Sequence, residues 1–143
     1  MRQFYDLFSE KLKKGSCFVL FLNRLVLAAV FISAGWGKFH NLDHVVGFFS
    51  TIGIPAANIQ APMVAAFELV GGVMIFAGFW TRLISIPLSI IMVVALATAH
   101  AGDIANVMML LKQAPFLYLL LFLTLMVTGP GKISLDAFLK WEK

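Results

Sequence analysis

The apolar stretch from Ala61 to Trp80 constrains the fold more than any other part of the chain, because its twenty residues include a single charged side chain, Glu68. A helix rises about 1.5 Å per residue and the hydrocarbon core of a bilayer is about 30 Å thick, so this stretch is long enough for one crossing. Glu68 would then lie roughly 10 Å inside the membrane, where an acid is costly. We therefore expect Glu68 to be protonated or to face the protein interior beside a cation.

The composition of the whole chain supports an integral membrane protein. Hydrophobic residues make up 61% of the 143 residues and charged residues only 13%, whereas about a quarter of an average soluble protein is charged. The basic residues are not gathered with aromatic residues in one patch, which argues against nucleic-acid binding. The single cysteine, Cys17, excludes an internal disulfide and a CxxC redox pair. Any electron transfer would therefore need a bound cofactor or another subunit.

Four apolar segments predict an all-α, four-helix transmembrane bundle within residues 16–138. The expected spans cover about 17–38, 61–80, 83–101 and 112–131, and a short amphipathic helix is expected in the first outer loop, between residues 40 and 60. Residues 1–15 predict a cytoplasmic amphipathic helix on the membrane surface, and residues 139–143 a basic cytoplasmic tail. A cleaved signal sequence is the less favoured alternative at the N-terminus, because Asn23 and Arg24 interrupt the apolar run.

The distribution of lysine and arginine predicts the orientation of the bundle. With both termini in the cytoplasm, eight basic residues lie inside and two, Lys38 and Lys112, lie outside. The eight are Arg2, Lys11, Lys13, Lys14, Arg82, Lys132, Lys140 and Lys143. The positive-inside rule favours this topology.

One face of the first span offers the cation that Glu68 needs. Arg24, Ala28, Phe31, Gly35 and Lys38 recur at steps of four and three residues, so they form one helical stripe. Long basic side chains can extend several ångströms along a helix, and either Arg24 or Lys38 could therefore reach Glu68. The resulting pair could be structural or functional, and the sequence leaves both interpretations open.

The predicted topology also gathers candidate ligand-binding residues in the outer half of the bundle. These are Lys38, Glu68, His100 and Lys112, of which Glu68 and His100 could handle protons. A histidine at a helix end is more often an interfacial group, which is the alternative for His100. The sequence has no zinc-site spacing, no facing pair of histidines and no phosphate-binding glycine loop, so we expect no metal site.

Several short motifs, in this order and spacing, resemble the DoxX family of small four-helix proteins of the bacterial inner membrane. They are Arg24-Leu25, FISAGWGK at 31–38, FELVGG at 67–72, AGFWTR at 77–82, His100 and TGPGKISLD at 128–136. One branch of the family is named for the small subunit of a membrane thiosulfate:quinone oxidoreductase, and related eukaryotic members act as cargo receptors. Some relatives carry an acidic residue before the last span, where this chain has Lys112-Gln113, which weakens transfer of the thiosulfate activity.

Two functional hypotheses follow. In the first, the chain is a subunit or accessory of a membrane redox complex, and its outer pocket binds a quinone or a sulfur oxyanion. In the second, it is a non-catalytic scaffold or small-molecule carrier whose buried charges are structural. The lipid bilayer is the expected partner in both. The sequence leaves open the oligomeric state, the partner subunits and whether the chain is itself an enzyme.

Overall fold

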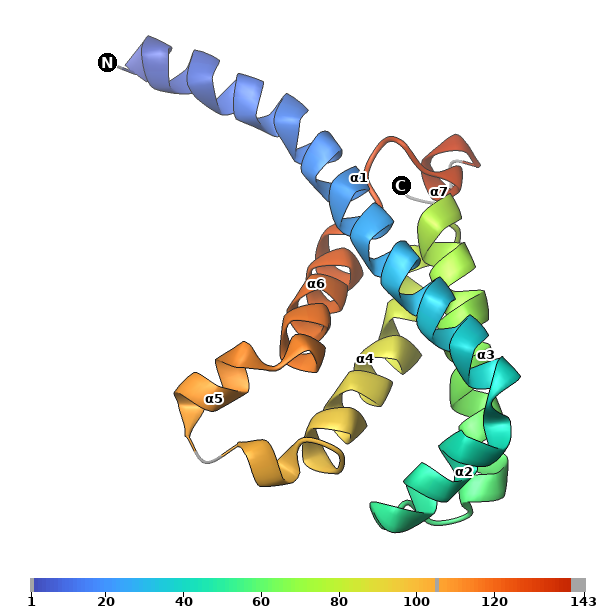
Figure 1. The fold of residues 1–143 in the computed structure, drawn as a ribbon. Helices are drawn as coiled ribbons and strands as arrows, with labels where there is room; N and C mark the ends of the chain where they lie inside the picture. Colours follow the sequence, from blue (N-terminus) through green and yellow to red (C-terminus); the bar gives the residue numbers. More distant parts are fainter. Residues whose placement is uncertain (1, 105, 140–143) are drawn as a thin grey trace.

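The computed structural model describes the backbone of residues 2–104 and 106–139, and the side chains of these residues from residue 15 onward except Asp103. All the regular elements in the described part are helices (Figure 1). In chain order they are α1 (Arg2–His40), α2 (Leu42–Thr51), α3 (Ala57–Ala77), α4 (Thr81–Ala97), a 3-10 turn η1 (Ala101–Asp103), α5 (Val107–Lys112), α6 (Ala114–Thr128) and α7 (Leu135–Phe138). Most of the basic tail expected at 139–143 lies outside the described residues.

The first helix is longer than the sequence predicted. We expected a separate surface helix before residue 16, but α1 runs without a break from Arg2 to His40. Gly15 does not interrupt it, because one glycine in a helix costs only about 1 kcal/mol relative to alanine. In Figure 1 the N-terminal part of α1 extends beyond the other helices.

The long helices form two pairs, in which α1 packs along α3 and α4 packs along α6. Figure 1 shows the pairs close together near α7 and diverging toward the end that carries α2 and α5. A core of Leu27, Phe31, Ile75, Leu88, Met92, Phe122 and Leu125 joins them. The rings of Phe31 and Phe122 meet edge to face with their centres 4.9 Å apart.

Glycines allow α1 and α3 to approach closely. A Cβ at Gly35 would lie 2.5 Å from the backbone nitrogen of Leu69, and one at Gly72 would lie 2.9 Å from that of Ile32. These distances are shorter than any ordinary contact, so only glycine fits at either position. Small residues at such crossings are typical of membrane helices. The stripe predicted on α1 lies in this interface, and Arg24, Ala28 and Phe31 are all buried.

The third and fourth apolar segments form shorter helices than expected. By length and composition, residues 15–40 of α1 and all of α3 could cross a membrane, whereas α4 has 17 residues and α6 has 15. The span expected from residue 112 is broken at Gln113, which is extended with ψ 126°. Pro115 explains the break, because its ring would clash with the carbonyl four residues earlier and it has no N–H to donate.

Candidate functional site

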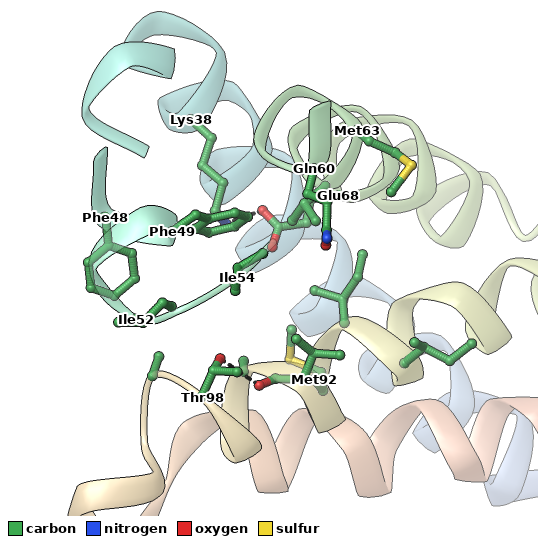
Figure 2. Close-up of a pocket in the computed structure, with 16 residues that line it drawn as sticks. Lys38, Phe48, Phe49, Ile52, Ile54, Gln60, Met63, Glu68, Met92 and Thr98 are labelled. Atoms are coloured by element: carbon green, nitrogen blue, oxygen red, sulfur yellow. Dashed lines mark hydrogen bonds and ion pairs between the residues drawn. The ribbon is translucent and has the colours of Figure 1, made fainter. Parts of the chain in front are cut away.

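A cavity of about 320 Å³ lies where the two helix pairs diverge. Its walls come from α1, α2, α3 and α4 and from the residues that follow α4. Four of the lining residues are polar, namely Lys38, Gln60, Glu68 and Thr98, and the rest are apolar. In Figure 2, Glu68 and Gln60 lie on the side of α3, and Met92 and Thr98 lie opposite them. The site is therefore an apolar chamber with its charged groups on one wall.

Helix α2 and the loop after it close one end of the chamber. Phe49 is buried and packs with Ala57 and Ala61 of α3, and Ile52 and Ile54 pack against the same cluster. Phe49, Ile52 and Ile54 also line the cavity. The sequence predicted a short amphipathic helix here, in the first outer loop. In the structure, α2 packs on α3 and supplies part of the cavity wall.

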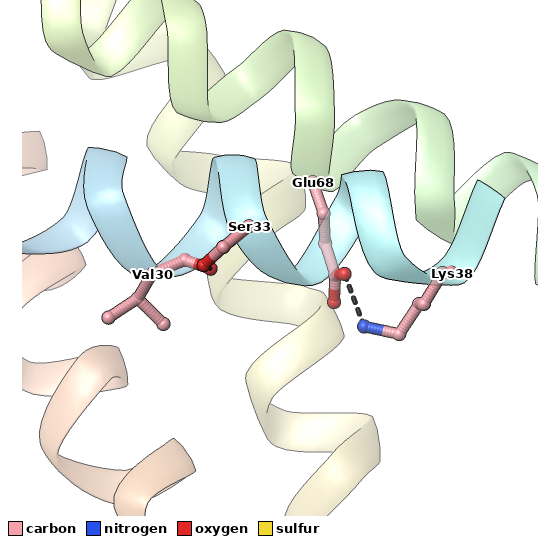
Figure 3. Close-up of polar contacts among 4 residues, drawn as sticks. All are labelled: Val30, Ser33, Lys38 and Glu68. Carbon is pink, nitrogen blue, oxygen red and sulfur yellow. Dashed lines mark hydrogen bonds and ion pairs between the residues drawn. The ribbon is translucent and has the colours of Figure 1, made fainter. Parts of the chain in front are cut away.

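The charged groups on the wall are an ion pair between Lys38 of α1 and Glu68 of α3. Figure 3 shows Lys38 Nζ directed at the Glu68 carboxylate, and the contact is to Oε2. Glu68 is almost fully buried, whereas the side chain of Lys38 is 27% exposed. The close crossing at Gly35, one helical turn before Lys38, brings the two helices near enough for this contact. An ion pair in such apolar surroundings interacts more strongly than one in water.

The other two polar side chains of the cavity are bonded to nearby backbone. Gln60 Nε2 donates a hydrogen bond to the carbonyl oxygen of Pro55 at 2.7 Å. Thr98 Oγ1 donates to the carbonyl oxygen of Val94 at 2.8 Å. Lys38 has two further N–H donors besides the one used by Glu68, because an ammonium group carries three. The site can therefore offer donors and a carboxylate to a ligand whose remainder is apolar.

Arg24, the other cation considered for Glu68, lies at the opposite end of the α1–α3 interface. Its guanidinium donates to the carbonyl oxygens of Ile75 at 2.8 Å and Pro130 at 3.3 Å, and also to those of Phe76 and Ile133. Arg24 is 2% exposed. It joins the C-terminal end of α3 to the segment after α6, and the structure therefore pairs Glu68 with Lys38 and not with Arg24.

Asp136 is a buried charged residue that the sequence analysis did not single out. Its carboxylate accepts hydrogen bonds from the backbone nitrogens of Trp80 at 2.8 Å and Thr81 at 3.1 Å. These groups lie at the N-terminal end of α4, where a carboxylate satisfies unpaired N–H groups and interacts favourably with the helix dipole. The only signal in the sequence was its place at the end of the TGPGKISLD motif, five residues after Gly131.

His100 and Lys112 do not join the cavity. His100 follows the end of α4 and is half-buried, and Lys112 is exposed at the end of α5. Neither residue lines the chamber that contains Lys38 and Glu68. The sequence grouped these two residues with Glu68 by their expected depth in the membrane. Depth alone does not determine which way a side chain points. Among the described residues, no three histidine, cysteine or acidic side chains are grouped as a metal site would require.

These features define a small, all-helical membrane protein with an ion pair in the wall of an apolar cavity. The sequence profile of the DoxX family matches residues 19–101, and the chain belongs to that family. No solved structure matches the chain.

Three curated proteins show the range of names among the relatives. "Putative oxidoreductase CatD" of Bacillus subtilis is 31% identical over 82% of this chain and 84% of its own length. "Inner membrane protein YqjF" of Escherichia coli is 29% identical over 82% of this chain and 91% of its own length. "Uncharacterized membrane protein Rv3486" of Mycobacterium tuberculosis is 35% identical over 79% of this chain and 76% of its own length. The matches therefore extend over most of each protein.

Proposed function

We propose that this chain is a multi-pass protein of the bacterial inner membrane that serves a quinone-linked redox system as a subunit or accessory. The observation that carries the proposal is the Lys38–Glu68 pair in the wall of an otherwise apolar cavity. The names of two relatives support a redox role in the inner membrane: CatD is named a putative oxidoreductase, and YqjF is named an inner membrane protein.

The cavity fits the headgroup of a quinone in size and chemistry. Its volume of about 320 Å³ is at the lower end of the range of small-molecule pockets. Apolar walls suit the ring, and the ammonium of Lys38 can donate to a carbonyl oxygen. A bound quinone would supply two-electron, two-proton redox chemistry. Lys38 would hold and orient the carbonyl group, and Glu68 would exchange a proton with the bound molecule at its carboxylate.

The same proposal includes four membrane crossings, by α1, α3, α4 and α6, with both termini in the cytoplasm. The eight-to-two distribution of basic residues supports it. Figure 1 supports it too, since α7 lies at one end of the helices and α2 and α5 lie at the other. In this topology residues 1–15 and 139–143 are cytoplasmic and residues 16–138 form the transmembrane domain.

Ligand binding to the purified protein tests the proposed site. Decylubiquinone added to the protein in lipid nanodiscs should bind saturably, and Glu68→Gln and Lys38→Met should each weaken binding by about tenfold, the equivalent of one charged hydrogen bond. Lys112→Met is a matched control, because this lysine is exposed and outside the cavity. Equal affinity in all four proteins would contradict the proposal.

A second candidate function is a non-catalytic scaffold or small-molecule carrier. The observation that favours it is the position of the ion pair across the α1–α3 interface, one turn beyond the Gly35 contact, where it would fix the register of the two helices. In that case Glu68→Gln would lower stability without any specific loss of quinone binding. Measuring unfolding and binding on the same variants separates the two functions.

A further inference from the structure

We infer that the cavity takes its ligand from the lipid bilayer, through an opening between α3 and α4, and that the ligand is an amphiphile with a hydrogen-bond-accepting head and an apolar tail. This inference rests on the proposed ligand site and adds the class of ligand and its route. We call the opening the α3–α4 edge and define it by Met63, Ile90 and Val94. All three line the cavity, and all three are also exposed, by 47%, 58% and 41%.

Contacts within the protein cover three sides of the cavity. The cluster of Phe49, Ala57 and Ala61, with Ile52 and Ile54 against it, covers the end near α2. On the side of α1, the helices meet backbone to backbone at Gly35 and Leu69. Toward α7, α3 and α4 close on each other, since a Cβ at Gly71 would lie 3.0 Å from a side-chain carbon of Leu88. The α3–α4 edge therefore holds three of the four exposed lining residues, and the fourth is Phe48 of α2, which is 46% exposed.

The surroundings of this edge are apolar and suit lipid. On α3, Phe67, Val70 and Val73 are exposed by 40%, 55% and 51%, and on α4 Ile86 and Val93 are exposed by 44% and 51%. Exposed apolar surface of this extent is expected where a helix faces acyl chains. A molecule dissolved in the bilayer would reach the cavity without crossing a polar surface.

The arrangement of groups inside sets the orientation of the ligand. The donors of Lys38 lie on the wall formed by α1 and α3, whereas the α3–α4 edge is lined by Met63, Ile90 and Val94. A head that accepts a hydrogen bond would lie at Lys38, and an apolar tail would leave between Met63 and Ile90. Isoprenoid quinones and fatty acids share this chemistry.

A tryptophan placed inside the cavity tests the route. Phe49→Trp, in a background where Trp36, Trp80 and Trp141 are replaced by phenylalanine, reports from a buried cavity position. In vesicles that contain 9,10-dibromostearic acid, this tryptophan should be quenched by the brominated chain and only weakly by acrylamide in the water. Ile54→Trp is a second reporter, to be used if the first variant does not fold.

Narrowing the edge should block the quencher. Ile90→Phe combined with Val94→Phe should reduce quenching by dibromostearate at least about fivefold, because the larger side chains would fill the opening that the brominated chain needs. Val93→Phe is the matched control, because Val93 is exposed on the same helix but does not line the cavity, and it should leave quenching unchanged. Lys38→Met should weaken dibromostearate binding about tenfold by removing the donor to its head.

Three results would overturn the inference: quenching by acrylamide that exceeds quenching by dibromostearate, an equal effect of Val93→Phe, or no effect of the paired phenylalanines. Decylubiquinone, which also quenches tryptophan, identifies the source of the ligand. Half-maximal quenching at a lower mole fraction of decylubiquinone than of dibromostearate supports a quinone. Half-maximal quenching at a lower mole fraction of dibromostearate would make a fatty acid the ligand. That result would contradict the proposed redox function but would still support entry from the bilayer.

Discussion

Replacing Gly35 with alanine should destabilise the protein through a single added methyl group. The new Cβ would lie 2.5 Å from Leu69 N, 2.8 Å from Leu69 Cα and 2.9 Å from Ala65 O, all of which are backbone atoms. A side chain could rotate away from such a contact, but the backbone of a helix cannot. Helices α1 and α3 would have to separate by about 1 Å to restore an ordinary contact distance.

The magnitude follows from two opposing effects. Forcing extra volume into a packed interface costs about 1–3 kcal/mol, whereas replacing glycine with alanine inside a helix gains about 1 kcal/mol. Gly37 provides a matched control, because it lies in the same helix and a methyl group added there would have no atom within 4 Å. Gly37→Ala should gain only the stabilisation that comes from replacing glycine with alanine inside a helix. The free energy of unfolding of Gly35→Ala should therefore be about 1–3 kcal/mol lower than that of Gly37→Ala.

Unfolding in mixed detergent micelles, followed by circular dichroism, measures this difference directly. The same displacement should weaken the Lys38–Glu68 contact, which lies one turn beyond Gly35, and ligand binding should fall with stability in Gly35→Ala. Equal unfolding free energies for the two alanine variants would refute the close approach of α1 and α3 on which the geometry of the site depends.

Three further sets of substitutions and one labelling experiment test other parts of the structure. Glu68→Gln and Lys38→Met should each lower the unfolding free energy by about 1–3 kcal/mol. The loss in the double variant should be smaller than the sum of the two single losses by at least about 0.5 kcal/mol. Additive losses would exclude a stabilising ion pair between Lys38 and Glu68. Arg24→Met should lower the free energy of unfolding by about 4 kcal/mol or more, since four carbonyl groups lose a charged donor. Arg24→Lys should restore little of this loss, because one ammonium group cannot reproduce the planar guanidinium. A lysine variant as stable as the parent protein would contradict this prediction. Asp136→Ala should lower the free energy of unfolding by about 1–2 kcal/mol, because the backbone N–H groups at the start of α4 lose their acceptor, and Asp136→Asn should lower it less. If both variants were as stable as the parent protein, Asp136 would not stabilise the start of α4. A cysteine at Asn41, in a Cys17→Ser background, should react with an impermeant maleimide from outside the cell, and reaction from the cytoplasm alone would reject the proposed topology.

Composition and periodicity were enough to predict several properties of the chain. The apolar segments predicted an all-helical membrane protein, and the family motifs predicted the DoxX family, which the profile match confirms. The stripe of Arg24, Ala28, Phe31, Gly35 and Lys38 also predicted the face of α1 that meets α3, and all of these residues except Lys38 are buried. These properties depend on helical spacing and on the cost of placing polar groups in lipid, and both can be read from neighbouring residues along one segment.

The partner of each buried charge was decided only by the tertiary structure. The sequence left Arg24 and Lys38 equal as candidate partners for Glu68, because both lie on one stripe and both have long side chains. Contact at Gly35 and Gly72 fixes the register of α1 on α3, which brings Lys38 to Glu68 and leaves Arg24 beside the carbonyl groups of Ile75 and Pro130.

The cavity likewise depends on contacts between segments distant in sequence. His100 and Lys112 were grouped with Glu68 by their distance from the membrane surface, but the direction of each depends on where α4 ends and where Pro115 breaks the chain. Phe49, Met63 and Val94 line the chamber although they are ordinary apolar residues in the sequence. Nothing in local spacing marks a residue as facing a cavity, because the cavity exists only where the two helix pairs diverge.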